Sequence, residues 1–396
     1  MQTKIFAAFL FFISSFISFA QKSEVFIKED WNKALELAKI SNKPIVVDFY
    51  TEWCGWCVEM DKKTFQDSMI ENRLTNEFIA VKLDAERGIG REVAMKYRIH
   101  SFPTIGYFQS NGKLIKKIPG FKEPSNFNED LDFIISYVNS EHSEPFPGIS
   151  KNLNPGFPDM YSKSFGPNGK REFPTKEEAQ NWFLSNQGIW ESEVYFSMLY
   201  KFTSLCNDEV IQSFLNHKER YSYLYGNDDV LSIMDNIISS RFYKLIKDKN
   251  RAGLDSLILD LPKYLDDEKK VAESSNYLQL LFFSKTEDYR ALVSLIEKNI
   301  ESKKISNSSL NDYAWDIYQK SGDNFVLNKA LKWMASVVQD DSNYMYLDTY
   351  ASLAYKLKDY VLAKEFALKA IEVGSKFGDD ISETEKLLQS INKGIK

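Results

Sequence analysis

A proline-rich stretch separates two parts of this chain with different hydrophobic patterns, and it constrains the fold more than any other feature. Residues 143–175 hold six of the eleven prolines in the 396-residue chain, together with four glycines. No periodic pattern of apolar residues continues through this stretch, so we expect a linker or an extended strap between domains. Its aromatic residues predict that it lies against a surface: Phe146, Phe157, Tyr161 and Phe165.

Before this stretch, residues 21–142 alternate between patterns typical of strands and of helices. Strands are expected at 45–50, 78–83, 104–109 and 113–118. Helices are expected at about 30–40, 54–74, 87–97 and 125–138. The last two strands are joined by a turn with Asn111-Gly112, a strong hairpin signal. The alternation predicts an α/β domain over residues 21–142.

After the stretch, residues 176–396 have helical patterns only, so we predict an all-α domain. Its first helix begins with a capping-box signature, Thr175 followed by Glu178. Helices are expected at 176–186, 189–205, 208–217, 228–247, 253–260, 268–283, 287–301, 308–320, 325–338, 345–357 and 360–373. Tyr313-Ala314 recurs as Tyr350-Ala351, and residues 308–375 resemble tetratricopeptide repeats, which are paired helices with small residues at their contacts.

The first twenty residues are typical of a cleaved secretory signal peptide. Lys4 is followed by an almost wholly apolar run from Ile5 to Phe19, and small residues precede Gln21. The run is short for a transmembrane helix, which needs about 20 residues, although a retained membrane anchor is the alternative. We therefore expect export to the periplasm, with secretion beyond it as the other destination.

The net charge and the number of cysteines limit which kinds of binding partner and functional site the chain can have. The net charge is -6, so the chain lacks the basic excess that binding to nucleic acid requires. Only three cysteines occur, Cys54, Cys57 and Cys206, too few for a scaffold held by disulfides. Cys206 falls in the helical domain, where we expect a buried, inert thiol, with a regulatory thiol that pairs with Cys54 as the alternative.

The other two cysteines are placed where a reactive dithiol would be expected. The sequence Trp53-Cys54-Gly55-Trp56-Cys57 follows a buried strand and begins a helix. Amide groups of a first helical turn and the helix dipole stabilise a thiolate at that position. A second cysteine one turn on can then resolve a mixed disulfide formed at the first. We expect Cys54 to be the entering nucleophile and Cys57 the resolving thiol.

A Cys-x-x-Cys pair has two other common uses in proteins. A zinc site needs four ligands, and the remaining candidates, His100, His142, His217 and Cys206, are scattered along the chain. A purely structural disulfide closing so short a loop would stabilise the fold little. We therefore expect neither a metal nor another cofactor.

The segment from Val47 to Cys57 resembles the active-site segment of thioredoxins. Asp48, six residues before Cys54, matches a buried acid of that family, whose raised pKa allows it to relay a proton to the resolving cysteine. Lys82 matches a lysine that pairs with this acid.

Further motifs of the same family follow in the same order. Phe102-Pro103-Thr104 resembles its cis-proline element, so a cis bond before Pro103 is expected opposite the dithiol, and Gly120 falls at its substrate-groove glycine. The resemblance implies a catalytic set of Cys54, Cys57, Asp48 and Pro103. It also implies a substrate-binding set of Trp53, Gly55, Trp56, Phe102 and Gly120.

The resemblance covers about residues 24–140 and implies an exported bacterial thioredoxin-family protein followed by a tetratricopeptide-like helical domain. The fold implied is a central mixed sheet flanked by helices, plus an all-α helical-repeat domain. The activity implied is thiol–disulfide exchange with protein clients. An unidentified electron donor would supply the electrons for this exchange. The helical domain is expected to bind a client or a protein partner.

The centre departs from the commonest thioredoxin pattern at Trp56, where proline is usual, and at Phe102, where a smaller residue is usual. Because Trp56 has no charge to stabilise the Cys54 thiolate, we expect a moderately reducing centre rather than a strong oxidant. Reduction, isomerisation and oxidation of clients stay open. The alternative functions are a non-enzymatic helical-repeat scaffold with a vestigial thioredoxin domain and, with less support, a peroxidase.

Overall fold

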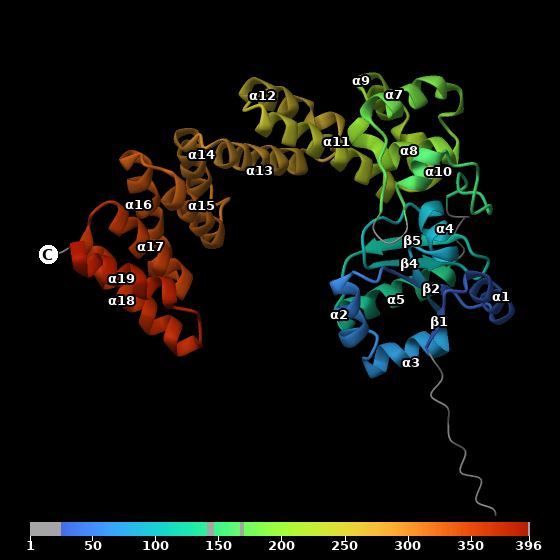
Figure 1. The fold of residues 1–396 in the computed structure, drawn as a ribbon, viewed down its shortest axis with the longest axis horizontal. Coiled ribbons are helices and arrows are strands. Elements are labelled where there is room, and N and C mark those ends of the chain that lie inside the picture. Colours follow the sequence, from blue (N-terminus) through green and yellow to red (C-terminus); the bar gives the residue numbers. More distant parts are fainter. Residues whose placement is uncertain (1–24, 141–145, 167–169, 395–396) are drawn as a thin grey trace, which may run out of the picture. The chain divides into compact units, whose positions relative to one another are not determined.

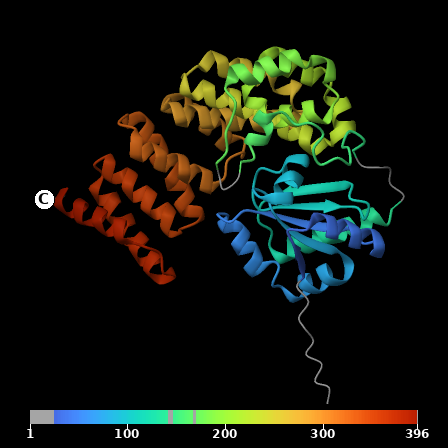
Figure 2. The same ribbon diagram turned by 45° about the vertical axis from the view of Figure 1, so that its right-hand side comes forward.

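The computed structural model describes residues 25–140, 146–166 and 170–394 (Figures 1 and 2). The expected signal peptide at 1–20 lies outside these residues, as do parts of the 143–175 stretch. Contacts divide the chain into two compact units, Met1–Ser232 and Ile233–Lys396. Because this division is based on contacts, it groups the first helices beyond residue 175 with the N-terminal unit. The domain boundaries predicted at 142 and 175 are based on changes of composition instead.

The N-terminal unit is built on a five-stranded sheet in the order β1-β3-β2-β4-β5. The strands are β1 (Phe26–Lys28), β2 (Ile45–Tyr50), β3 (Ile79–Asp84), β4 (Thr104–Phe108) and β5 (Leu114–Pro119). The pairs β1–β3 and β3–β2 are parallel, whereas β2–β4 and β4–β5 are antiparallel. The expected mixed sheet is thus confirmed, with an additional edge strand, β1, that the sequence pattern did not predict.

Helices cover both faces of this sheet. They are α1 (Trp31–Ser41), α2 (Gly55–Lys63), α3 (Ser68–Glu77), α4 (Gly88–Lys96) and α5 (Pro124–Val138). Successive β2 residues point to opposite faces: Val47 packs in a core with Trp31 of α1 and residues of α4. Val46 packs in a second core with Met60 of α2 and residues of α3 and α5.

The single helix expected over 54–74 is wrong, because the chain forms two helices there. The first ends at Lys63, and Asp67 caps the second by accepting hydrogen bonds from the N–H groups of Met69 and Ile70. The intervening turn places Phe65 in the core beneath the sheet. Burial of this aromatic ring therefore outweighs continuation of the helix.

The described part of the 143–175 stretch lies against the N-terminal domain, as its aromatic residues predicted. It contains one short helix, α6 (Asp159–Lys163). Tyr161 is fully buried, and its hydroxyl donates to the carbonyl of Met95 at 2.8 Å. The Arg91 guanidinium donates to the carbonyl of Phe165 at 2.6 Å. We refer to residues 146–175 as the strap.

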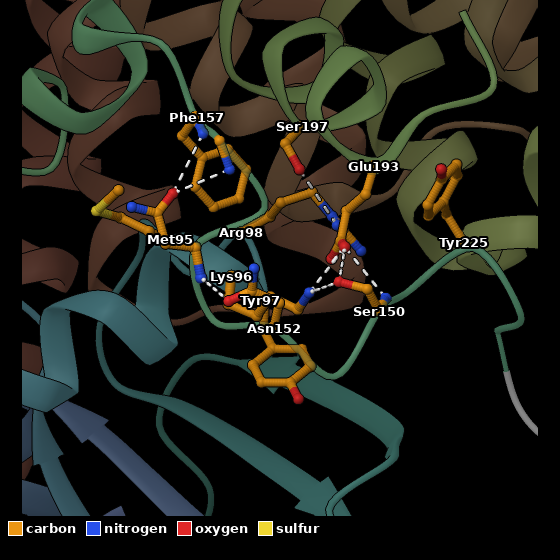
Figure 3. A network of polar contacts seen from close by, with 12 residues as sticks. Met95, Lys96, Tyr97, Arg98, Ser150, Asn152, Phe157, Glu193, Ser197 and Tyr225 are labelled. Carbon is orange, nitrogen blue, oxygen red and sulfur yellow. Dashed lines mark hydrogen bonds and ion pairs between the residues drawn. The ribbon is translucent and has the colours of Figure 1, made fainter. Parts of the chain in front are cut away.

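Buried ion pairs join the next helices to the sheet domain. These helices are α7 (Lys176–Ser185), α8 (Glu193–Phe202), α9 (Asp208–Asn216), α10 (Lys218–Tyr225) and α11 (Asn227–Lys247). Lys96 Nζ lies 2.7 Å from Glu193 Oε2, which also accepts from Ser150 of the strap (Figure 3). Asp229 lies 2.8 Å from Arg98 Nε and 2.9 Å from Lys117 Nζ. Since an unpaired buried charge is costly, these pairs specify how the helices dock.

The second compact unit is helical throughout its described residues. Beyond α11 its helices are α12 (Arg251–Asp260), α13 (Glu268–Thr286), α14 (Tyr289–Glu301), α15 (Asn307–Lys320), α16 (Asn324–Asp340), α17 (Tyr344–Lys356), α18 (Tyr360–Phe377) and α19 (Ser382–Gly394). The helices α10 and α19 were not predicted. Ala351 and Ala354 of α17 share a core with Ala363 and Ala367 of α18, as small residues at helix contacts should. Among the described helices none is long and apolar enough to cross a membrane.

Candidate active site at Cys54 and Cys57

The two cysteines form a disulfide at the N-terminus of α2, directly after the carboxyl end of β2. Cys54 is the residue that caps the helix, and the N–H group of Cys57 donates to its Sγ at 3.0 Å. Both cysteines are buried. The same amide, together with the helix dipole, would stabilise a thiolate on Cys54 once the disulfide is reduced.

Two exposed tryptophans flank this disulfide. Trp53 is 60% exposed and Trp56 is 63% exposed. The Trp53 ring meets Phe102 edge-on at 5.9 Å between centroids, and the Trp56 ring lies 5.7 Å from that of Phe121. Large apolar side chains grouped at a surface mark a site of contact with other molecules. Gly55, between the tryptophans, has no atom within 4 Å of the position of an added Cβ, which leaves its backbone open.

The loop before β4 lies beside the turn that follows β5. The Phe102–Pro103 peptide bond is cis, which confirms that prediction. The N–H group of Gly120 donates to the carbonyl of Pro103 at 2.8 Å. Gly120 has φ +98°, and an added Cβ would meet nothing within 4 Å, so backbone conformation rather than space favours glycine there.

Asp48 lies on β2, directly opposite Lys82 of β3 in the strand register. Its side chain is 1% exposed, and its Oδ2 is 3.2 Å from Lys82 Nζ. Burial raises the pKa of Asp48 to about 6, although the positive charge of Lys82 opposes this rise. Lys82 also pairs with Asp61, whose negative charge raises the Asp48 pKa further. A carboxyl with such a pKa exchanges its proton close to neutral pH.

Two charged residues that the sequence patterns did not single out extend the site. Trp53 Nε1 donates to Glu86 Oε2 at 3.0 Å, and Glu86 Oε1 lies 3.2 Å from Nη2 of Arg171 in the strap. Glu86 follows the carboxyl end of β3, and β3 runs parallel to β2, the strand that leads to Cys54. The topology of the sheet could have indicated it. Arg171 lies in an aperiodic segment, where no pattern indicates a partner.

A cavity of about 360 Å³ borders the loop that precedes β4. It is lined by residues of that loop, of β5, of α8 and of α11, among them His100, Ser101, Tyr200 and Asp228. Burial and nearby cations lower the pKa of His100 well below its usual value, so its imidazole is neutral. Within the described residues, no three His, Cys, Asp or Glu side chains are grouped to hold a metal.

Cys206 lies apart from the dithiol, after the end of α8. It is a free, buried cysteine, and burial raises the pKa of its thiol to about 12. A thiol with this pKa is almost entirely protonated at neutral pH, and a protonated thiol is a poor nucleophile. The expectation of a buried, inert thiol agrees with these observations.

Comparison with known proteins finds proteins similar to the domain that carries this site. A model of the thioredoxin-like domain matches residues 31–135. The thiol:disulfide interchange protein DsbD of Vibrio vulnificus is 32% identical over 124 residues, which are 29% of this chain and 21% of that protein. The protein disulfide-isomerase of Datisca glomerata is 28% identical over 101 residues, 26% of this chain and 18% of the relative. The chain thus spans about a fifth of the length of these curated relatives.

Among solved structures, a thioredoxin from Thermus thermophilus is 18% identical and matches 30% of this chain and 100% of its own, with a TM-score of 0.27. The family match and the mixed sheet together make residues 31–135 a thioredoxin-like domain. With a disulfide-forming Cys54–Cys57 pair at its helix N-terminus, this domain is of the thiol–disulfide oxidoreductase class.

Proposed function

We propose that this protein is an exported thiol–disulfide oxidoreductase that reduces or exchanges disulfides of exported proteins. The observation that carries the proposal is the amide of Cys57 donating to Cys54 Sγ at the start of α2. A sulfur in this position is stabilised as a thiolate, which is the form that attacks a disulfide. The export step rests on the signal-peptide pattern of residues 1–20, with the periplasm as destination.

In the first step, the Cys54 thiolate attacks one sulfur of a client disulfide. A bond forms between Cys54 Sγ and that sulfur, the client S–S bond breaks, and the other client sulfur leaves as a thiolate that takes up a proton. In the second step, the Cys57 thiolate attacks Cys54 Sγ. The enzyme disulfide forms, the mixed disulfide breaks, and the client has gained two electrons.

Asp48 serves the second step as the acceptor of the Cys57 proton. Its pKa of about 6 leaves the carboxyl largely ionised at neutral pH and still basic enough to hold a proton briefly. Lys82 positions it from the neighbouring strand at 3.2 Å. The oxidised centre is then reduced by a thiol or dithiol donor, whose identity the cell determines.

Clients bind across the exposed aromatic rim. Trp53 and Trp56 supply apolar contact, and the open backbone at Gly55 allows a client chain to approach the disulfide. Phe102, Pro103 and Gly120 form the opposite side of the site, with backbone available for pairing with an extended client segment. The helical region, tetratricopeptide-like at 308–375, binds a client or partner protein.

The enzyme assignment is tested by reduction of insulin driven by dithiothreitol. The wild-type chain should accelerate the precipitation of insulin, and Cys54→Ser should reduce the rate to that of dithiothreitol alone, because the attacking thiolate is lost. Equal rates for wild type and Cys54→Ser would contradict the proposal. Cys206→Ser serves as the matched control and should keep the wild-type rate, since this thiol is buried and protonated.

The division of roles between the cysteines is tested by trapping in cells. Cys57→Ser should accumulate mixed disulfides on Cys54 because the resolving step is blocked, and mass spectrometry of these species identifies the clients. If Cys57→Ser forms no disulfide-linked species while Cys54→Ser does, the two roles are reversed.

A further inference from the structure

We propose that Arg171 of the strap and Lys201 of α8 form a subsite that binds a carboxylate of the client, beside its reactive cysteine. This inference rests on the proposed function and names a class of client: proteins with an aspartate or glutamate near the disulfide that is attacked. The strap and α8 would then determine which clients the dithiol of the sheet domain prefers.

Arg171 is in contact with both aromatic residues on one side of the dithiol. Its guanidinium carbon lies 5.9 Å from the centre of the Trp53 ring and 5.7 Å from that of Phe102. These two residues directly precede Cys54 and Pro103 in the sequence. The Arg171 side chain is 24% exposed. A client segment bound between Cys54 and the cis-proline loop would therefore meet this guanidinium.

Most of the hydrogen-bonding capacity of Arg171 is unused. A guanidinium has five N–H donors in a planar fork that matches a carboxylate. Among the described residues, its only hydrogen-bond acceptor is Glu86, which one Nη2 donor reaches at 3.2 Å. Glu86 also accepts from Trp53 Nε1. The remaining donors are free to form a charge-assisted hydrogen bond with a ligand.

Lys201 adds a second positive charge on the same side. Its Nζ lies 4.2 Å from the centre of the Phe165 ring and 5.7 Å from that of Phe173, both in the strap. In the described part of the chain, no carboxylate lies within ion-pair distance of this ammonium. Burial, with the nearby charge of Arg171, lowers the pKa of Lys201 to about 8, so it is still mostly charged at neutral pH. A half-buried ammonium without an acid is stabilised when an anion binds.

The surroundings offset this charge only in part: Glu86 pairs with Arg171, whereas Lys201 has no carboxylate within ion-pair distance among the described residues. Burial lowers the pKa of His100 most, and the positive charges of Lys201, Lys117 and Arg171 lower it further, so these three cations lie near the loop that precedes β4. The negative charge of Asp229 raises the pKa of His100, but this carboxylate is already paired with Arg98 and Lys117. A client carboxylate is complementary in charge to this side of the dithiol, whereas a client lysine or arginine would be repelled.

The experiment compares disulfide-containing fluorogenic peptides that differ at a single position. Glutamate and glutamine are placed in turn at each of the three positions on either side of the cysteine, and dithiothreitol-driven reduction by the full chain is followed. At one or two of these positions the wild type should show kcat/KM about fivefold higher for glutamate than for glutamine, mainly through KM, since a partly exposed ion pair is worth that much. Added salt should reduce the ratio.

The variants assign this preference to the two cations. Arg171→Gln should bring the glutamate-to-glutamine ratio close to one, Lys201→Gln should lower it, and Arg171→Lys should keep part of it. The matched control is Arg220→Gln, which removes an exposed arginine paired with Glu191 on the helices, and it should keep the wild-type ratio. Circular dichroism checks that each variant is folded.

Three outcomes would overturn the inference. If the wild type reduces both members of every peptide pair equally, or if Arg171→Gln keeps the wild-type ratio, the subsite does not exist, although insulin reduction would still stand. If neither the peptides nor insulin are reduced faster by the wild type than by Cys54→Ser, the proposed function fails and the inference fails with it.

Discussion

At the scale of single residues, the burial of Asp48 changes what a carboxyl group can do. The side chain lies within the sheet, and the loss of hydration raises its pKa from 3.8 to about 6, even with Lys82 at 3.2 Å. Lys82 also pairs with Asp61, so its positive charge only partly offsets the effect of lost hydration on the Asp48 pKa. The carboxyl therefore gains a pKa suited to proton transfer, and the fold is less stable whenever Asp48 is ionised.

Asp48→Asn should stabilise the oxidised protein at pH 8 and have little effect near pH 3.5. Because the pKa in the folded state lies above 3.8, the folded protein binds more protons than the unfolded chain between about pH 4 and 6, and the free energy of unfolding falls as pH rises through this window. The gain at pH 8 should be up to about 3 kcal/mol by urea unfolding. Exposed Asp228→Asn is the control, and a loss of stability in Asp48→Asn at pH 8 would contradict the argument.

At the scale of elements, cations next to α4 and on β5 share one acid that lies far along the sequence. Arg98 and Lys117 both pair with Asp229 of α11, 131 residues beyond Arg98. The guanidinium also lies 5.2 Å from the ring of Phe196 and 5.7 Å from that of Tyr225. This arrangement joins the helices to the sheet domain, and Lys201 of α8 lies against Phe165 and Phe173 of the strap.

Asp229→Ala should destabilise the N-terminal unit by about 3–5 kcal/mol, because two buried cations lose their shared carboxylate. The adjacent Asp228 is exposed, and Asp228→Ala should change the free energy of unfolding by less than about 0.5 kcal/mol. Urea unfolding followed by circular dichroism measures both variants. Equal losses in the two variants would show that the buried pairs do not hold these elements together.

At the scale of the whole molecule, the two compact units have separate cores. The dithiol, Asp48 and the strap all belong to Met1–Ser232. The second unit, Ile233–Lys396, contains the small-residue core of α17 and α18. A defect in that core should therefore leave the chemistry of the first unit intact.

Ala367→Leu should lower the stability of the second unit by about 1–3 kcal/mol, since the added side chain overfills a fully buried helix contact. The rate of insulin reduction, measured below the unfolding transition, should equal that of the wild type. Leu368→Ala, at a half-exposed neighbouring position, is the surface control for the thermal unfolding measurements. Loss of insulin reduction in folded Ala367→Leu would show that the units are coupled.

Much of the centre could be predicted from the sequence because its signals are local. The strand before Cys54 was predicted with its observed bounds, and the helix after it begins within one residue of the predicted start, because both depend on a few neighbouring residues. The cis bond before Pro103 was expected from the resemblance to thioredoxins. The break between α2 and α3 was missed because it depends on Phe65 packing against residues distant in sequence. Helix α10 was missed because it is only 8 residues long, and α19 was missed because it contains few apolar residues.

The sequence by itself determined the α/β character of the first domain, the position of the dithiol and the helical character of the remainder, since hydrophobic periodicity and helix-start signals act over a few residues. The likeness of the first domain to thioredoxins came from its motifs. Only the tertiary structure decided what surrounds the dithiol. Glu86 and Arg171 are 85 residues apart, and Lys96 and Glu193 are 97 apart. Pairs of this kind form because buried charges must find partners once the chain has collapsed, and no local pattern records which partner each one finds.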